Sequence, residues 1–349
     1  MIDFRYHLVS IVAVFLALAI GIVLGSTALQ GDTLDVLRST TNSLRNQLNA
    51  ANAAAASANQ QVGAGSQFLQ IAEPTLLKDR LTGARIVLVT EPGATSAVID
   101  GIQQAAGEAG ATITGTVALQ PKFNDLSGTT RAGLSQLNVQ FASHDGVALT
   151  PGTDKQTVYQ QEAAQLIAAA ILEQTAGQPV LTASEAQNLL KAYADGGYLT
   201  ASSGTLTDGA TLAVIVTPPA TTADGSSDPA DEVLVALAAE FAGASAATVV
   251  AGPVMGTTTS SSAISVLRNS SVSGQVSTVD NADTRLGQIS TIWALASQLQ
   301  GGKPNTYGVS GASAVSPPVP SPVPSVTPTV PATPTSKATG KVKKTVNTK

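Results

Sequence analysis

The side chains best suited to chemistry lie in one short segment, directly after an apolar run at 276–279 that is predicted to be a strand. Asp280, Asn281, Asp283 and Arg285 supply two carboxylates, an amide and a guanidinium. Ligands of open parallel sheets bind at the loops that follow the carboxyl ends of the strands, so we expect a ligand or partner to contact this segment. The alternative is structural: Asp280 or Asn281 caps the next helix, and Asp283 lies in its first turn, where a negative charge suits the helix dipole.

The rest of the chain offers little for catalysis or for a tightly bound metal. His7 lies beside the predicted membrane segment, and His144 lies in what reads as a surface turn, Ser143–Gly146. Cysteine is absent, and the methionines are Met1 and Met255. Cu(I) prefers Cys and Met, whereas Cu(II) accepts imidazole, so one chain is not expected to build a tight copper site. We expect no enzymatic activity and no resident cofactor.

Composition excludes several other classes of function. The net charge of -5 and the pI near 5.0 argue against a nucleic-acid surface, which needs a clustered basic face. The turn at Thr90–Thr95 has one glycine and neither a Gly-x-Gly-x-x-Gly nor a Walker pattern, so a nucleotide site is weakly supported. Binding or scaffolding is therefore the expected mode of action.

The pattern from about residue 84 to 300 is typical of an α/β domain with a mainly parallel, Rossmann-like sheet covered by helices. Arg85–Thr90 and Thr112–Leu119 read as buried strands around a helix at Thr95–Glu108, which is one βαβ unit with a right-handed crossover. Further strands are predicted at Thr211–Thr217, Ala247–Ala251 and Val276–Val279, and further helices at Lys155–Gln174, Ala183–Ala194, Pro229–Phe241, Ser261–Asn269 and Asp283–Leu299.

The segment that must hold this domain in place is an uncharged apolar run, Leu8–Gly25, preceded by Arg5. At about 1.5 Å per residue it spans roughly 27 Å, enough to cross a bilayer core. We predict a transmembrane helix at 8–28, with residues 1–7 as a cytoplasmic stub by the positive-inside rule. A cleaved signal peptide is the alternative, but its apolar region is usually shorter, about 7 to 15 residues.

A heptad pattern follows this segment and predicts a coiled coil over 29–62. Apolar residues alternate at steps of three and four, which is typical of a parallel homodimer seam. The alternative is a helix that packs on its own globular domain. Gly63–Ser66 is expected to end this helix, and a second helical stretch at 67–81, with Pro74 in an early turn, leads into an extracytoplasmic domain at 67–308. The strongest seam positions are Leu34, Leu37, Leu44 and Leu48.

The C-terminal segment 309–349 is expected to be a disordered tail. Prolines recur every second or third position among Ser, Thr and Val, which favours extended conformations without helix or central strand. Its end is basic. Such a tail would contact an anionic cell-wall polymer or serve only to keep the protein soluble. The basic residues are Lys337, Lys341, Lys343, Lys344 and Lys349.

Two segments carry a resemblance to a known family. The start Ile2–Ser10 (IDFRYHLVS), with the apolar run after it, resembles the actinobacterial MctB family, which includes members called SteB. The segment Ser277–Thr284 (STVDNADT), followed by Gly287 and by Gly301–Gly308, resembles it as well, and Thr-Val-Asp-Asn is the most specific part. The likeness spans nearly the whole chain before the tail.

The resemblance implies two different roles. The family is described as a copper-transport protein of the mycobacterial outer membrane, which implies a role in copper efflux or homeostasis; only this resemblance points to copper as a bound metal. SteB members are described as single-span proteins that act with a membrane partner, SteA, in envelope assembly and division. The sequence itself favours the single-span topology, because a membrane barrel would need many strands of alternating polarity.

Overall fold

The chain divides into two compact units, Met1–Phe68 and Leu69–Lys349, and each is described by itself. Helical residues 4, 27–34, 144 and 145 are described by their backbone alone. The computed structural model describes residues 4–145, 147, 149, 155–173, 181–202, 206–220, 229–254 and 262–323.

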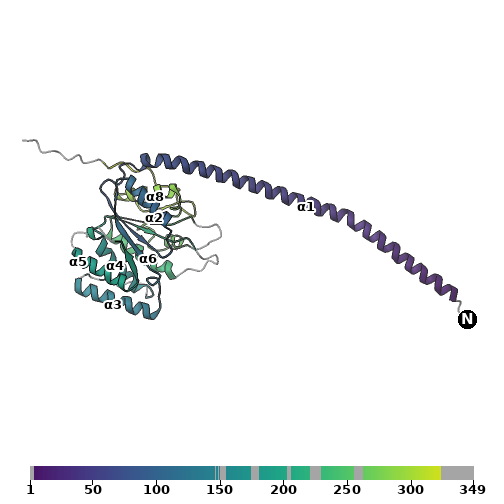
Figure 1. Cartoon of the computed structure of the whole chain (residues 1–349), viewed down its shortest axis with the longest axis horizontal. Coiled ribbons are helices and arrows are strands. Elements are labelled where there is room, and N and C mark those ends of the chain that lie inside the picture. The colour runs from purple at the N-terminus through teal and green to yellow at the C-terminus, as the bar shows by residue number, and fades with distance from the viewer. Residues whose placement is uncertain are drawn as a thin grey trace, which may run out of the picture. The chain divides into compact units, whose positions relative to one another are not determined.

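The first element is one long helix, α1, which runs from Phe4 to Leu77 (Figure 1). It contains the predicted apolar segment, which at Arg5–Ser26 is long and apolar enough to cross a membrane. The expectation that Gly63–Ser66 ends the helix is wrong. A helical glycine costs only about 1 kcal/mol relative to alanine, and the strong helix formers on either side outweigh that cost. Pro74 therefore lies in the last turns of α1 and not at the start of a second helix.

The leucines of the predicted seam are exposed along α1. Leu37, Leu44 and Leu48 have 63%, 60% and 61% of their surface accessible to solvent. The side chain of Leu34 lies outside the described residues. An exposed leucine row on a long helix is what an unpartnered coiled-coil strand would present, and the dimer itself stays a prediction.

The second unit contains a seven-stranded sheet with the order β3-β2-β1-β4-β5-β6-β7. All neighbouring strands are parallel except β2 and β3, which are antiparallel. The predicted mainly parallel α/β class is therefore confirmed. The strands are β1 (Arg85–Thr90), β2 (Thr112–Leu119), β3 (Leu199–Ala201), β4 (Leu212–Val216), β5 (Ala247–Ala251), β6 (Ser277–Val279) and β7 (Thr306–Tyr307).

Helices cover both faces of this sheet, and the helix at Gly128–Asp145, α3, was not predicted from the sequence. The predicted surface turn at Ser143–Gly146 is wrong, because residues 143–145 form the end of α3; Gly146 lies outside the described residues. The helices are α2 (Ser96–Glu108), α3 (Gly128–Asp145), α4 (Val158–Ile171), α5 (Ala183–Asp195), the short η1 (Leu206–Asp208), α6 (Pro229–Ala244), α7 (Ala263–Arg268) and α8 (Arg285–Leu299).

Two hydrophobic cores result, one on each face. The side chains of strand β1 alternate between these cores. Ile86 and Leu88 lie in the core that includes α2 and α8, whereas Val87 and Val89 lie in the core that includes α3 to α7. Successive side chains of a strand point to opposite faces, so a strand buried on both must be apolar throughout. The C-terminal end of α1 joins the α2 and α8 core through Leu77.

The connection through α8 has an unusual hand. Helix α2 carries the chain from β1 to β2, and α8 carries it from β6 to β7, in the opposite direction along the strand order, yet both lie on the same face (Figure 1). Helices α6 and α7 also connect parallel neighbours and lie on the other face. The β6-α8-β7 crossover therefore has the opposite hand to the other three, which share the right-handed form that dominates parallel sheets. This arrangement places α8 beside α2 and the end of α1.

The segment after β7 belongs to the folded domain. Residues 309–323, here called the strap, were expected to start the disordered tail, and that boundary is wrong. Val323 donates its N–H to the carbonyl of Asp79 at 2.7 Å, and the Gln300 side chain bonds the backbone of Ser321. The Arg80 guanidinium donates to the carbonyl of Pro320. The remaining tail, 324–349, with its lysines, lies outside the described residues.

Candidate functional site

Asp280 stands at the carboxyl end of β6, and the structure uses both of its oxygens internally. Its side chain is fully buried. One oxygen accepts the N–H of Val309 at 2.7 Å, and the other accepts the N–H of Ser310 at 3.0 Å and the guanidinium of Arg268 at 2.8 Å. A carboxylate that is saturated and sealed in this way fastens the strap to the sheet and has no free oxygen to offer an outside ligand.

Arg268, the last residue of α7, is the partner that sequence reasoning missed. Besides Asp280, its guanidinium donates to Thr278 at 2.8 Å, to the carbonyl of Ser310 at 2.6 Å and to the carbonyl of Tyr307 at 2.8 Å. Only 8% of its side chain is exposed. A buried charge is tolerated only when it is paired and hydrogen-bonded, as this one is. The signal in the sequence is a lone arginine that ends an apolar helical run.

Gly308 leaves room for this junction. Its φ is +129°, and a Cβ built there would overlap the Asp280 carboxylate. Only glycine adopts such a φ without strain. The chain can therefore pass directly over Asp280 and present two consecutive N–H groups, from Val309 and Ser310, to its oxygens.

Capping of α8 differs from both sequence expectations. The N-cap is Thr284, whose hydroxyl oxygen accepts the N–H of Gly287 at 3.1 Å, so neither Asp280 nor Asn281 caps the helix. Asn281 is buried, and its side-chain oxygen lies without a partner among the described residues. Asp283 is exposed, precedes the cap and accepts the N–H of Val254 at 2.9 Å, from the loop after β5.

Arg285, the first residue of α8, binds the end of α1. Its guanidinium lies 3.1 Å from the carboxylate of Glu73, which is 1% exposed. Burial raises the pKa of Glu73 above its ordinary value, although the nearby Arg285 opposes that shift. The indole N–H of Trp293, on the next turns of α8, donates to the carbonyl of Leu76 at 3.3 Å. These contacts fix the last turn of α1 to α8.

The predicted site residues thus share one stretch but contact four different elements: α7, the strap, the loop after β5 and the end of α1. We call Asp280–Arg285 with Arg268 and Glu73 the junction. Its chemistry is that of paired charges and caps. Among the described residues, the structure groups no three His, Asp or Glu side chains in a way that could hold a metal ion. Met255 and the side chain of His144 lie outside the described residues.

This chain is similar to known proteins over nearly its entire length. The sequence profile of the family described as "Copper transport outer membrane protein, MctB" matches residues 1–317. The protein named "Copper transporter MctB" in Mycobacterium tuberculosis (strain ATCC 25618 / H37Rv) is 27% identical over 319 residues, which cover 90% of this chain and 99% of that protein. Its namesake in Mycobacterium leprae (strain TN) is 29% identical over 325 residues, 91% of this chain and 100% of that protein.

Proposed function

The chain belongs to the MctB family, and we propose that it acts in copper efflux or homeostasis as a membrane-anchored, non-enzymatic protein of the cell envelope. The observation that carries this proposal is the family match over residues 1–317, which includes the apolar helix as well as the α/β domain. Relatives that are named copper transporters match at 27–29% identity across almost their full length. Copper is the cargo in this proposal and not a resident cofactor.

Membrane topology is the next part of the proposal. We propose that Arg5–Ser26 is retained as a single transmembrane helix, with the N-terminus in the cytoplasm and the α/β domain outside. Arg5 precedes the apolar run, and the positive-inside rule keeps that end cytoplasmic. An inner-membrane position follows; the outer membrane of the family's description is the alternative. Fractionation of the native protein between the two membranes, with protease added from outside, decides between them.

The copper role is tested by deletion and complementation in the native host. Loss of the protein is expected to raise cell copper, measured by mass spectrometry, and the full chain is expected to restore it. Purified chain in planar bilayers then separates conduction from indirect action: ion currents would favour transport by the protein itself. Normal cell copper after deletion, together with silent bilayers, would discard the copper role.

A scaffold in envelope assembly or division is the second candidate, and the exposed leucine row on α1 favours it. Leu37, Leu44 and Leu48 are all more than half exposed, as expected for a seam that awaits a second copy. The chain has no cysteine, so a single Leu44→Cys variant reports self-association by disulfide formation. Asn46→Cys, on the opposite side of the same heptad, is the matched control. A covalent dimer through position 44 and not 46 is expected; equal yields would contradict a parallel seam.

Partner binding completes the scaffold proposal. A membrane protein like SteA is the partner that the resemblance implies, and a cell-wall polymer is the one that the lysine-rich tail would attract. Crosslinking in cells, followed by purification of the full chain, is expected to recover a membrane partner, and loss of the protein is expected to alter septa at normal copper. Unaltered septa and an absence of any crosslinked partner would leave the copper role alone.

A further inference from the structure

The strap ends in a proline-rich segment, residues 317–323 (PPVPSPV), here called the proline ridge. Such a run favours the polyproline II helix, which has three residues per turn and no internal hydrogen bonds. Burial along the ridge follows the same period: Pro317 and Pro320 are buried and Val323 is half-buried, whereas the residues between them are exposed. This period indicates a polyproline II helix that rests on the domain by one of its three edges.

Hydrogen bonds to the ends of two helices hold the ridge in place. Just after α1, the carbonyl of Asp79 accepts the N–H of Val323 at 2.7 Å. Just after α8, the Gln300 side chain donates to the carbonyl of Ser321 at 2.7 Å and accepts the N–H of the same residue at 3.2 Å. A segment that is already fixed by its buried edge loses little conformational entropy when a partner binds its exposed edges.

The two free edges of the ridge are mostly apolar. Residues three apart in sequence align along a polyproline II helix, so the exposed residues form two rows. One row is Pro318 with Ser321, and the other is Val319 with Pro322. Val319 is 60% exposed although its side chain is apolar. The outer surface of the ridge therefore consists mainly of two proline rings and a valine side chain, with no charged group.

The backbone of the ridge also offers hydrogen-bond acceptors. The domain bonds the carbonyls of Pro320 and Ser321. The carbonyls of Pro318 and Val319 accept no hydrogen bond from the residues that the structure describes. Proline rings beside free carbonyls are what aromatic-lined grooves recognise: the rings pack against aromatic faces, and a Trp N–H or Tyr O–H in the groove donates to the carbonyls.

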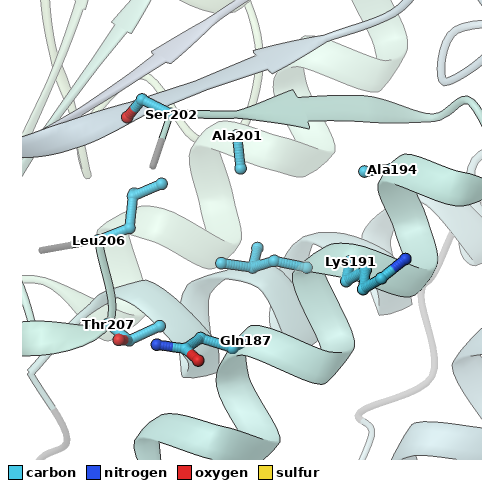
Figure 2. Close-up of a pocket in the computed structure, with 8 residues that line it drawn as sticks. Gln187, Lys191, Ala194, Ala201, Ser202, Leu206 and Thr207 are labelled. Atoms are coloured by element: carbon cyan, nitrogen blue, oxygen red, sulfur yellow. The ribbon is translucent and has the colours of Figure 1, made fainter. Parts of the chain in front are cut away.

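This chain does not supply such a groove itself. Every aromatic side chain of the α/β domain is buried or half-buried, and the exposed aromatic residues among those described lie on α1, at Tyr6, Phe15 and Phe68. A cavity of about 370 Å³ lies between β3 and α5 (Figure 2), but the described residues that line it include no aromatic side chain. A second copy of the chain is therefore a poor partner for the ridge.

We propose that the proline ridge is a preformed ligand for an aromatic-lined groove on another protein. The proposal rests on the proposed function only for the place where the partner is sought, the cell envelope. A proline-rich segment in a flexible chain must be ordered when it binds, whereas the domain has already fixed this one. The ridge gives the scaffold candidate a contact surface that is separate from the leucine row on α1.

Photocrosslinking of the full chain in cells of the native host tests the proposal. Benzoylphenylalanine replaces Val315, which is 55% exposed and lies two residues before the ridge, so that the ridge itself stays intact. An adduct with a different protein is expected. The absence of any adduct would overturn the proposal. A crosslink between two copies of the chain, seen as a species of doubled mass, would overturn it as well, because it assigns the ridge to a second copy.

Two matched variants of the crosslinking chain test whether the ridge makes the contact. Val319→Asp places a charge on a free edge and is expected to lower the adduct yield about tenfold, because an aromatic groove does not replace the water around a carboxylate. Val139→Asp is the control, since Val139 is 58% exposed on α3, on the other face of the sheet, and the yield is expected to stay unchanged. Both variants are expected to keep the parent's urea midpoint, read by the fluorescence of Trp293. Equal adduct yields would overturn the proposal.

A competitor tests the chemistry of the partner with the unchanged ridge, so this measurement does not depend on how a variant folds. Poly-L-proline occupies grooves that bind polyproline II helices, and in permeabilised cells it is expected to abolish the adduct. A Gly-Ser peptide of equal length is expected to leave the adduct unchanged. An adduct that persists with poly-L-proline would overturn the proposal. None of these results alters the copper content of a deletion strain, so this proposal and the copper role fail separately.

Discussion

Replacement of Asp280 by Asn is the sharpest test of the junction. The change keeps the size of the side chain but removes the charge that pairs with Arg268, which is only 8% exposed and lies 2.8 Å away. Breaking one partner of a buried ion pair costs about 3 to 5 kcal/mol, because it leaves the other charge uncompensated. The two strap donors bond different oxygens of Asp280, and the amide keeps only one oxygen, so its NH₂ group faces either Val309 or Ser310 and the bond from that N–H is lost.

Urea unfolding of the full chain in detergent measures this cost. Trp293 is the single tryptophan, and its fluorescence reports on α8 directly. With a slope of about 3 kcal/mol per M, the midpoint of Asp280→Asn is expected to fall by about 1 to 1.7 M. Asp283→Asn is the matched control: its side chain is exposed and keeps an oxygen for the N–H of Val254, so a change within about 0.5 kcal/mol is expected. A midpoint for Asp280→Asn no lower than that of Asp283→Asn would refute the structural role of the buried pair.

Three further predictions use the same unfolding assay. The raised pKa of Glu73 means that its carboxyl contributes stability that is present below pH 4.5 and is lost as the pH rises through the folded-state pKa. Wild type is therefore expected to lose stability relative to Glu73→Gln between pH 4 and pH 7.5. A relative gain would show that the attraction of Arg285 outweighs the effect of burial on this carboxyl. Gly308→Ala places a Cβ against the Asp280 carboxylate at a φ of +129°. It is expected to lower the free energy of unfolding by about 1 to 3 kcal/mol or more. An unchanged unfolding midpoint would contradict the close approach of Gly308 to Asp280. Thr284→Ala removes the cap of α8 and is expected to cost about 1 kcal/mol, whereas Thr284→Ser should be nearly neutral; equal losses in both would argue against the hydroxyl cap.

The buried strands show how much of the fold local sequence can predict. The predicted bounds of β1, β2 and β5 coincide with the observed ones. Strands β1 and β5 are buried almost throughout, so they are mostly apolar, and such a run is visible in the sequence alone. Strand β2 is only partly buried, and its β-branched Thr, Ile and Val residues indicate it instead. Strands β3 and β7 could not be predicted from such a run. β7 has two residues and β3 has three, so their positions depend on the strands beside them.

Helix α3 was missed for a different reason. Its apolar residues do not form a clear stripe, and the histidine near its end was read as part of a turn. A usable signal precedes it: Asp125 accepts the N–H of Ser127 at 2.9 Å and the hydroxyl of Thr130 at 2.6 Å, which lowers the pKa of Asp125 and stabilises the start of the helix. An Asp followed two and five residues later by Ser and Thr is a start signal that the sequence does contain.

The sequence by itself determined the elements whose residues act over short distances: the apolar helix, the heptad row, the buried strands and the segment at 280–285 where charged residues gather. Tertiary structure alone decided what those charged residues do. Arg268 precedes Asp280 by twelve positions and Glu73 precedes Arg285 by 212. Only the packing of α7 and the strap against the end of β6, and of the end of α1 against α8, brings these charges within 3.1 Å. Burial then decides the outcome, because a carboxylate removed from water must be satisfied by whichever donors the fold places beside it.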